Sequence, residues 1–487
     1  MKLQIAKLAE GCKPSGFSAP DGLRRSAKTA TYSRMVLFAD YFRKQVTMKA
    51  FCQFSILSCL FFAIGCNDSP PTATHSTSTS TSTSIGDTPA TNNVPLVTII
   101  QPGDDAERKA QEALIEAEPG EIIEFAEGVF EFKGTLSLNG ISGITLRGKG
   151  MDKTILNFTG QRAGSGGEGL KIKADKFTIE DLTIQNTPGD AIKVEDSKGV
   201  TFRRIRTWWS RGPRQDNGAY GIYPVLCTDV LIEHCLAECA SDAGIYVGQP
   251  QRTIVRHNRV ERNVAGIEIE NTIGADVYEN EATNNTGGLL VFSLPGLKLK
   301  NGSHCRAFKN HVYDNNHPNF ANKGAIVSSV PAGTGLMIMA NDDVEIFDNN
   351  VHGNNTTNCV ITSFLITQRK FEDSEYDPFP EGVYIHDNHF ADGGKSPQGE
   401  IGKLFEQLAG LPMPDIVIDG VHNPKIEVDG KVPENARIYI ANNGDATFAD
   451  LGFAAMLQGG KPEITRDLLS HAGKRTPLEA IVIPGVK

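Results

Sequence analysis

A step of about 22 residues repeats through the middle of the chain. At each step a small residue opens a short apolar alternation, and a second alternation opens nine residues after it. The first alternation begins at Ala191, Gly221, Gly244, Gly266 and Gly288. A fixed period with strand-like alternation inside it is typical of a solenoid, in which each repeat packs on its neighbours. The period therefore predicts an all-β stack of coils.

Asparagines form a column in the same repeats, five residues after the second alternation opens. The column contains Asn258, Asn280, Asn310, Asn349 and Asn388. Each coil has room for three short strands, and about ten coils at about 4.8 Å each give a rod on the order of 50 Å long. Because identical residues of successive coils lie above one another, we expect a ladder of amides bonded along the stack.

The two ends of the repeat region carry helical patterns. From Gly103 to Pro119 alanines and Leu114 share one face of a predicted helix, which would cover the open edge of the first coil. After Gly393 the period fades, and residues 400–408 read as a helix. We therefore place the β-helix domain at 96–395 and a C-terminal capping extension at 396–487.

The segment before the repeats reads as an export signal. Residues 1–47 are basic and show no apolar period, so we interpret them as a mis-annotated upstream extension with Met48 as the true start. Residues 48–66 combine a basic start, a short apolar run and small residues, as signal peptides do. Residues 67–95 are rich in Ser and Thr and have little to bury, which predicts a disordered tether.

The last four residues of this signal, AIGC, resemble the bacterial lipobox, although the family usually has Leu where Ala63 stands. The resemblance implies lipidation of Cys66 and anchoring to the bacterial cell envelope, periplasmic or outer surface. The alternatives are plain secretion and an apolar run without meaning.

Charge and cysteines narrow the choice of partners. Without residues 1–65, which hold ten Lys or Arg and three Asp or Glu, the formal charge falls from -10 to -17. Such an acidic protein lacks the basic footprint of a nucleic-acid partner. The repeats and their flanks hold Cys227, Cys235, Cys239, Cys305 and Cys359. Five cysteines cannot all pair within one chain, and we expect buried free thiols.

One face of the coils should form a groove. In the first strand of each coil Ile192, Ile222 and Ile245 point inward, so the residues that follow them point outward as one ladder. Insertions at 206–220 and 317–334 lengthen the connection that enters this strand. Insertions at 293–304 and 363–382 lengthen the connection that leaves it. These four insertions would be walls, and the ladder would be the floor.

The first insertion combines aromatic and basic residues, as a site for an acidic sugar would. The candidate substrate-binding residues are Arg203, Trp208, Trp209, Arg211 and Arg214. The alternative is that the tryptophans pack the insertion onto the rod and the arginines pair with surface acids.

The floor offers acid and base groups: Lys193, Tyr223, Tyr246 and Glu268 are the candidate catalytic residues. Proton removal beside a uronate would use Lys193 or Tyr223 with Tyr246, and an arginine on the carboxylate. Glycoside hydrolysis would use two carboxylates, with Glu268 and Glu270 two residues apart, and with Glu195 or Asp242 as further candidates. Each of these residues is also explained as part of an exposed ladder.

Five motifs carry a resemblance to a known family: residues 218–225 (GAYGIYPV), 241–248 (SDAGIYVG), 265–270 (AGIEIE), 282–288 (ATNNTGG) and 330–335 (VPAGTG). They resemble exported bacterial parallel β-helix repeat proteins of the pectin-lyase-like superfamily, a family without assigned activity. The resemblance implies a right-handed single-stranded parallel β-helix. The motifs of pectate lyases, polygalacturonases and alginate epimerases are absent or lack their spacing, which puts any carry-over of their residues in doubt.

Together these features predict an envelope-anchored monomer that binds an acidic polysaccharide. If the protein is an enzyme, we expect a polysaccharide lyase or a uronate C5-epimerase. The alternatives are a non-catalytic protein that binds a glycan or an exported partner protein, and a structural rod. No cofactor is predicted, because no His, Cys and Asp cluster has metal-ligand spacing; calcium at residues 341–353 has no binding loop to support it.

Overall fold

The computed structural model describes residues 95–161, 167–457 and 459–486. The chain divides into two compact units, and the larger one, Phe61–Ala455 with Pro462–Lys487, holds all the described strands. The predicted segments 1–47 and 48–66, with Cys66, lie outside the described residues, as does nearly all of 67–95. Within the described residues, every helix is too short or too polar to span a bilayer.

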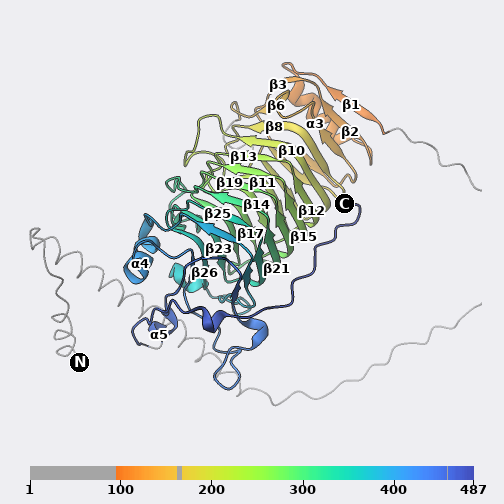
Figure 1. Ribbon diagram of the computed structural model, residues 1–487. Helices are drawn as coiled ribbons and strands as arrows, with labels where there is room; N and C mark the ends of the chain where they lie inside the picture. Colours follow the sequence, from red (N-terminus) through yellow and green to blue (C-terminus); the bar gives the residue numbers. More distant parts are fainter. Residues whose placement is uncertain (1–94, 162–166, 458, 487) are drawn as a thin grey trace, which may run out of the picture. The chain divides into compact units, whose positions relative to one another are not determined.

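An 11-stranded parallel sheet, here called the first sheet, carries the first strand of each coil. Figure 1 shows its strands stacked along the coil axis. Its strands, in order, are β4 (Leu136–Asn139), β7 (Leu170–Lys173), β9 (Ile192–Glu195), β11 (Tyr220–Val225), β14 (Ala243–Gly248), β17 (Ala265–Glu270), β20 (Gly287–Phe292), β23 (Thr334–Met339), β26 (Thr357–Thr362), β29 (Ile416–Ile418) and β31 (Phe448–Asp450).

The other two strands of each coil form a 20-stranded parallel sheet, the second sheet. One ladder contains β1 (Val97–Ile100), β2 (Ile122–Phe125), β5 (Thr145–Arg147), β8 (Thr178–Gln185), β10 (Lys198–Trp208), β12 (Thr228–Glu233), β15 (Gln251–Arg256), β18 (Ile273–Tyr278), β21 (Ser303–Phe308), β24 (Asp342–Phe347), β27 (Tyr384–His386) and β30 (Tyr439–Ala441). The next ladder contains β3 (Gly128–Glu131), β6 (Thr154–Asn157), β13 (Leu236–Glu238), β16 (Arg259–Glu261), β19 (Glu281–Thr283), β22 (His311–Tyr313), β25 (Asn350–His352) and β28 (His389–Ala391). Strands β8 and β10 run through both ladders without a break.

The predicted inward column fills the core of the stack. Ile222 pairs in register with Ile192 and Ile245, and all three are fully buried. The five cysteines of the described residues are buried and free, as expected. The three strands of each coil thus enclose one continuous apolar core.

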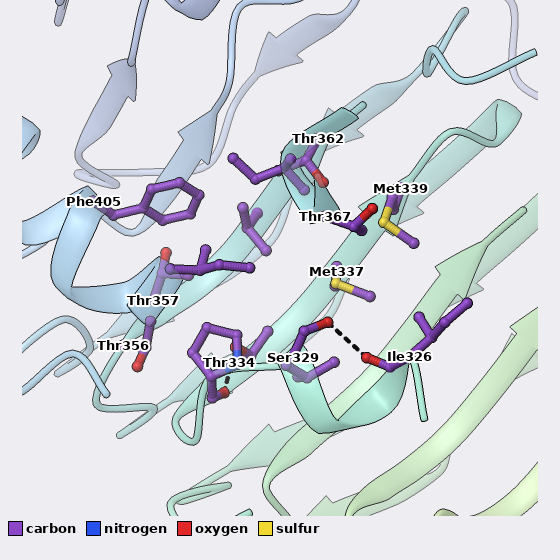
Figure 2. A pocket seen from close by; sticks show the side chains of 15 residues that line it. Ile326, Ser329, Thr334, Met337, Met339, Thr356, Thr357, Thr362, Thr367 and Phe405 are labelled. Carbon is purple, nitrogen blue, oxygen red and sulfur yellow. Dashed lines mark hydrogen bonds between the residues drawn. The ribbon is translucent and has the colours of Figure 1, made fainter. Parts of the chain in front are cut away.

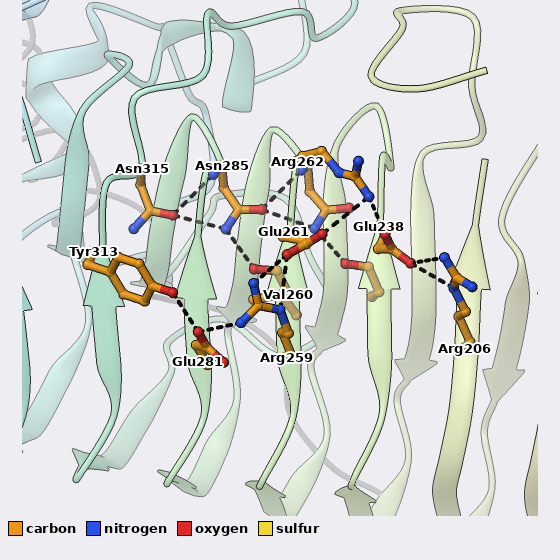
Figure 3. A network of polar contacts seen from close by, with 12 residues as sticks. Arg206, Glu238, Arg259, Val260, Glu261, Arg262, Glu281, Asn285, Tyr313 and Asn315 are labelled. Carbon is orange, nitrogen blue, oxygen red and sulfur yellow. Dashed lines mark hydrogen bonds and ion pairs between the residues drawn. The ribbon is translucent and has the colours of Figure 1, made fainter. Parts of the chain in front are cut away.

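The asparagine ladder is confirmed. The side-chain amide of Asn310 donates to Asn349 at 3.0 Å and receives the amide of Asn280 at 3.0 Å. A second ladder follows five residues later, where Asn285 bonds Asn315 at 2.9 Å (Figure 3). Both ladders satisfy buried corner amides along the stack, so the coil corners are fixed by hydrogen bonds as well as by packing.

Helices close or flank the stack. Helix α3 (Ala106–Glu116) buries Ala106, Ala110 and Leu114 at the N-terminal end, as predicted. Helix α4 (Gly399–Ala409) also forms where it was predicted. The remaining short helices are η2 (Val327–Ser329), η3 (Phe364–Thr367), η4 (Glu434–Ala436), α5 (Phe453–Leu457) and η5 (Leu468–His471).

The coils continue beyond the predicted boundary at residue 395. Strand β29 pairs with β26, β30 with β27 and β31 with β29. The C-terminal tail, residues 462–486, then runs back along the second sheet toward β12 (Figure 1). The backbone N–H of Leu478 donates to Glu345 at 2.9 Å and that of Ile481 to Asp276 at 3.1 Å. The first part of the extension therefore adds further coils, because its strands pair with strands that residues before 395 leave without a neighbour. Its last part packs along the outside of the second sheet.

Candidate functional site

The outer face of the first sheet is walled by the insertions, as predicted. On the exit side, segments 293–304 and 363–382 are tied together: Lys300 bonds Asp373 at 2.9 Å, and the Tyr376 hydroxyl donates to the carbonyl of Ser293 at 2.7 Å. On the entry side, Gln215 donates to Asn322 at 2.9 Å, which joins segments 206–220 and 317–334. The two segments of each wall are therefore tied to each other by hydrogen bonds.

Segment 317–334, here called the bridge, crosses from one wall to the other. It leaves the entry side, and near its middle Arg369 of the exit wall donates to the carbonyls of Gly324 at 3.1 Å and Ala325 at 2.9 Å. Asn319 holds the returning arm through the carbonyls of Val327 at 2.9 Å and Val330 at 3.0 Å. The groove is therefore covered at the coils around β20 and β23.

Under the bridge lies a cavity of about 220 Å³. Four carboxyls gather in and beside it, here called the carboxyl cluster: Asp190, Asp242, Glu268 and Glu270. Glu268 and Glu270 stand on β17, where alternate residues share the outer face. Asp242 directly precedes β14, and Asp190 lies two residues before β9, at the corner where the chain enters the first sheet.

Burial raises the pKa of every member of the carboxyl cluster. It raises the pKa of Glu270 to about 7 and that of Asp190 to about 6. The pKa of Glu268 rises well above its ordinary value through burial and then through the charges of Asp242 and Glu270. Burial also raises the pKa of Asp242, with Glu270 and Asp190 adding to the effect. Low-dielectric surroundings and like charges both favour the protonated acid.

Three tyrosines pack beside the carboxyls. The ring of Tyr220 stacks on Tyr246 at 4.2 Å and lies 4.7 Å from Tyr223. The hydroxyl of Tyr220 donates to Asp242, and that of Tyr246 donates to Glu270. Burial raises the pKa of Tyr223 and Tyr246 above the ordinary phenol value, so both stay protonated. Tyr220 and Tyr246 therefore supply hydrogen bonds to the cluster, and neither Tyr223 nor Tyr246 is a base at neutral pH.

Glu268 has no protein partner in the cluster, and its carboxyl oxygens are open to the cavity. Its side chain is 2% exposed and lines the cavity, yet among the described residues it makes no hydrogen bond or ion pair. A buried carboxyl without a partner is costly, and in native proteins it points to a functional role or a bound group.

Two buried carboxylates on the second sheet, Glu233 and Glu238, are paired with arginines, unlike those of the carboxyl cluster. Glu233 bonds Arg203 at 2.6 Å and Arg256 at 2.6 Å; burial acts to raise its pKa, but these bonds lower it below the ordinary value. Figure 3 shows Glu238 between Arg206 and Arg262 in the same way. Glu233 and Glu238 are thus paired with arginines, whereas Asp242, Glu268 and Glu270 have no salt bridge among the described residues.

Beyond the bridge the floor becomes apolar. A smaller cavity there lies between the bridge and α4, with Met337 and Met339 on the floor and Phe405 on the helix (Figure 2). Its lining contains no charged side chain. Met337 and Met339 border both cavities.

The structure brings all four candidate catalytic residues onto one ladder. Lys193 pairs in register with Tyr223, and its ammonium lies 5.5 Å from that ring and 3.3 Å from Glu195. Tyr246 pairs in register with Glu268. Lys193 and Tyr223 lie toward the open end of the groove, and Tyr246 and Glu268 lie under the bridge.

The candidate substrate-binding residues are not brought together. Arg203 lies on the second sheet, paired with Glu233, because it precedes the corner that leads into the first sheet. Trp209 is 1% exposed and donates from Nε1 to the carbonyl of Thr187 at 2.7 Å, so no face of its ring is free for a sugar. Trp208 lies on the second sheet under the guanidinium of Arg206 at 4.5 Å.

Arg211 and Arg214 are exposed on the first insertion. Both pair with Asp216, at 3.2 Å and 2.7 Å. This is the arrangement of the alternative interpretation, in which the arginines pair with surface acids. The predicted cluster of tryptophans and arginines therefore does not form one surface.

The sequence analysis did not identify Asp190 or Tyr220 as site residues, and it did not predict that segment 317–334 crosses the groove. Asp190 and Asp242 each precede a strand of the first sheet, and this repeated position could have indicated that both lie at the same edge of the groove. No group of three or more His, Cys, Asp or Glu in the described ranges has the geometry of a metal site.

Comparison with known proteins agrees with this architecture. A family model described as "Right handed beta helix region" matches residues 133–282 and 214–370. None of the curated proteins matches the chain.

Among solved structures, the A-module of a mannuronan C-5 epimerase from Azotobacter vinelandii is similar, at 16% identity and a TM-score of 0.48, over 72% of this chain and 93% of that one. An endopolygalacturonase from Stereum purpureum has 14% identity and a TM-score of 0.40, over 61% and 96%. An alginate lyase from a Paenibacillus species has 14% identity and a TM-score of 0.36, over 71% and 97%. At such identities the likeness concerns the fold alone.

Proposed function

The chain is a right-handed parallel β-helix repeat protein, and we propose that it processes a glycan held in the groove over the first sheet. The observation that carries the proposal is Glu268, a buried carboxyl without a partner that faces a cavity beside two other carboxyls. Walls tied by hydrogen bonds, aromatic rings and convergent acids are the features of a preformed carbohydrate site.

The reaction that fits these groups best is glycosidic-bond hydrolysis. Such hydrolysis needs one protonated acid for the leaving oxygen and one carboxylate for the sugar or for water. Burial and then the charges of Asp242 and Glu270 raise the pKa of Glu268 well above its ordinary value, which favours the protonated acid. Glu270, two residues along the same strand and also lining the cavity, has a pKa of about 7 and is partly ionised at neutral pH. Two carboxyls whose surroundings separate their pKa values are a recurring acid and base pair.

A lyase or C5-epimerase acting on an acidic polysaccharide is the second candidate. Lys193 supports it, since its ammonium stands beside Tyr223 at the open end of the groove and could meet a uronate carboxylate. Against it, the arginines predicted to bind the uronate carboxylate lie elsewhere, and no Lys or Arg of the described residues lines the cavity beside the carboxyl cluster. The remaining alternative is that the groove binds a glycan or an exported partner protein without catalysing a reaction.

A panel of neutral and uronic glycans separates these candidates. New reducing ends without ultraviolet absorbance indicate hydrolysis, and absorbance of unsaturated uronates indicates elimination. Glu268→Gln should lower kcat about 100-fold or more, the usual contribution of a positioned acid. Glu131→Gln, at an exposed glutamate of β3 on the second sheet, is the control and should keep full activity. If no glycan is bound or cleaved, the proposal fails.

We also propose that the protein is exported and tethered to the cell envelope through a lipid on Cys66. The sequence AIGC in a signal-like segment supports this. Detergent phase partition tests it: the full chain should enter the detergent phase and Cys66→Ala should stay in the aqueous phase. Equal partition of both proteins would contradict a lipid anchor.

A further inference from the structure

The bridge turns the groove from an open channel into a pocket with one open end. Gln215 holds it from the entry wall, and Arg369 holds it at Gly324 and Ala325 from the exit wall. The floor residues beneath it are covered: Leu290 is 0% exposed and Phe292 is 5% exposed. Lys193 and Tyr223, toward the N-terminal coils, remain half-buried. A polymer lying along the floor would therefore meet the bridge.

The cavity at this closed end is small. Its volume of about 220 Å³ is below the range of roughly 300–1,000 Å³ that holds drug-sized ligands. One terminal sugar ring suits this space better than several units of a chain. The carboxyl cluster lies at the open side of the cavity, where the bond behind a terminal sugar would fall.

The far side of the cavity is apolar. Leu290, Phe292 and Met339 form its floor, and Ile326 and Val327 of the bridge form its cover. A hydroxyl placed there would lose its hydrogen bonds to water, and a carboxylate would be worse. A methyl or acetyl group would gain by burial.

From this we infer that the groove binds the end of a glycan chain, with a terminal sugar whose methyl or acetyl group faces Leu290, Phe292 and the bridge. The inference rests on the proposed glycan function and adds the position of attack and the class of terminal sugar. Terminal 6-deoxy sugars and acetylated amino sugars have such groups. Release of the terminal unit by hydrolysis adds the elements of one water molecule across the bond, with the proton from the carboxyl cluster going to the leaving oxygen.

The test follows chain length in time, using the glycan that the panel identifies. Wild-type protein should release small products while the remaining polymer keeps its length. In competition binding, tetrasaccharides that differ only in their terminal sugar should rank 6-deoxyhexose or acetylated hexosamine about tenfold above hexose, and hexuronic acid last; one methyl group in an apolar pocket commonly contributes this much.

Variants of the bridge provide the structural arm. Arg369→Ala removes both bonds to the bridge and should allow cleavage or binding inside chains, with at least a tenfold loss of end preference. Asn322→Ala, which loses the bond to Gln215, should act in the same direction. Arg252→Ala is the matched control, because this arginine pairs with Asp229 on the second sheet, away from the groove. Melting temperatures show whether each variant is folded.

The outcomes are separable. Random shortening of the polymer by the wild-type protein, or a preference for hexose over 6-deoxyhexose, overturns this inference and leaves the glycan function standing. Binding without turnover, with one protein molecule for each chain end whatever the chain length, supports end recognition and excludes hydrolysis. Absence of any binding or product overturns both proposals together.

Discussion

Replacing Glu270 by glutamine is expected to stabilise the fold at neutral and alkaline pH. Glu270 is 4% exposed, and burial raises its pKa from 4.5 to about 7. Its folded pKa therefore lies above its unfolded pKa. Below about pH 4 both states hold the proton and the burial of a charge costs nothing.

As pH rises from about 4.5 to 7, the unfolded chain gives up its proton and the folded chain keeps it, so the wild-type protein loses stability. The rise from 4.5 to about 7 corresponds to a loss of about 3 kcal/mol above pH 7, at about 1.4 kcal/mol for each tenfold change in the ionisation constant. Glutamine has no proton to lose, and its carbonyl can still accept the hydroxyl of Tyr246. The variant and the wild type should therefore match near pH 4 and differ by about 3 kcal/mol at pH 8.

Urea denaturation at pH 4, 6 and 8 measures this difference. Glu195→Gln is the control: Glu195 occupies the same outward column, is 30% exposed and has Lys193 at 3.3 Å, so its replacement should change stability little at any pH. A Glu270→Gln variant that is destabilised at pH 8, or that keeps the wild-type pH dependence, would show that this carboxyl is not buried as a neutral acid.

Four further outcomes follow from the same contacts. Asn310→Ala leaves the amide of Asn280 and the carbonyl of Val277 unsatisfied and should cost about 3 kcal/mol in urea denaturation; the exposed Asn350→Ala should cost almost nothing, and equal effects would contradict a structural ladder. Trp209→Ala should lower the free energy of unfolding by about 3 kcal/mol or more because it leaves a cavity, and Trp208→Ala should lower it less. Weaker glycan binding with unchanged stability in Trp209→Ala would refute the packing role of Trp209. Arg475→Ala removes the bonds to Asp343 and Gly382 and should speed proteolysis of the C-terminal tail, with Leu469→Ala, at an exposed side chain, as the silent control. Hydrolytic activity should rise with pH through about 7, where Glu270 ionises, and a rate that falls through this range would exclude Glu270 as the base.

The repeat made much of the fold readable. Inward and outward positions alternate strictly along a strand. Once Ile192, Ile222 and Ile245 were assigned to the core, the residues that follow them, Lys193, Tyr223 and Tyr246, had to point outward. The asparagine column was readable for the same reason, since one step of the period moves a residue to the equivalent place in the next coil. Its parallel ladder, five residues further on, carried the same signal and was missed.

At the first insertion, residues that are neighbours in the sequence do not share one surface. Trp208 and Trp209 are adjacent, yet one covers the second sheet and the other turns inward after β10 ends. Arg203 precedes a coil corner, and the corner directs it to a different sheet from the groove. A corner changes the facing of every residue on its far side, and sequence alternation does not report where the chain turns.

By itself the sequence determined the stack, its phase and the face that bears the groove, because these depend on local alternation repeated at a fixed step. The tertiary structure decided which carboxyls share one enclosed space and which receive an arginine. It also decided that the bridge crosses the groove, since that depends on Gln215 and Arg369 reaching one segment from opposite walls. Burial and the charge of neighbours from other coils set the proton affinity of Glu268 and Glu270, and neither quantity is encoded in the residues next to them.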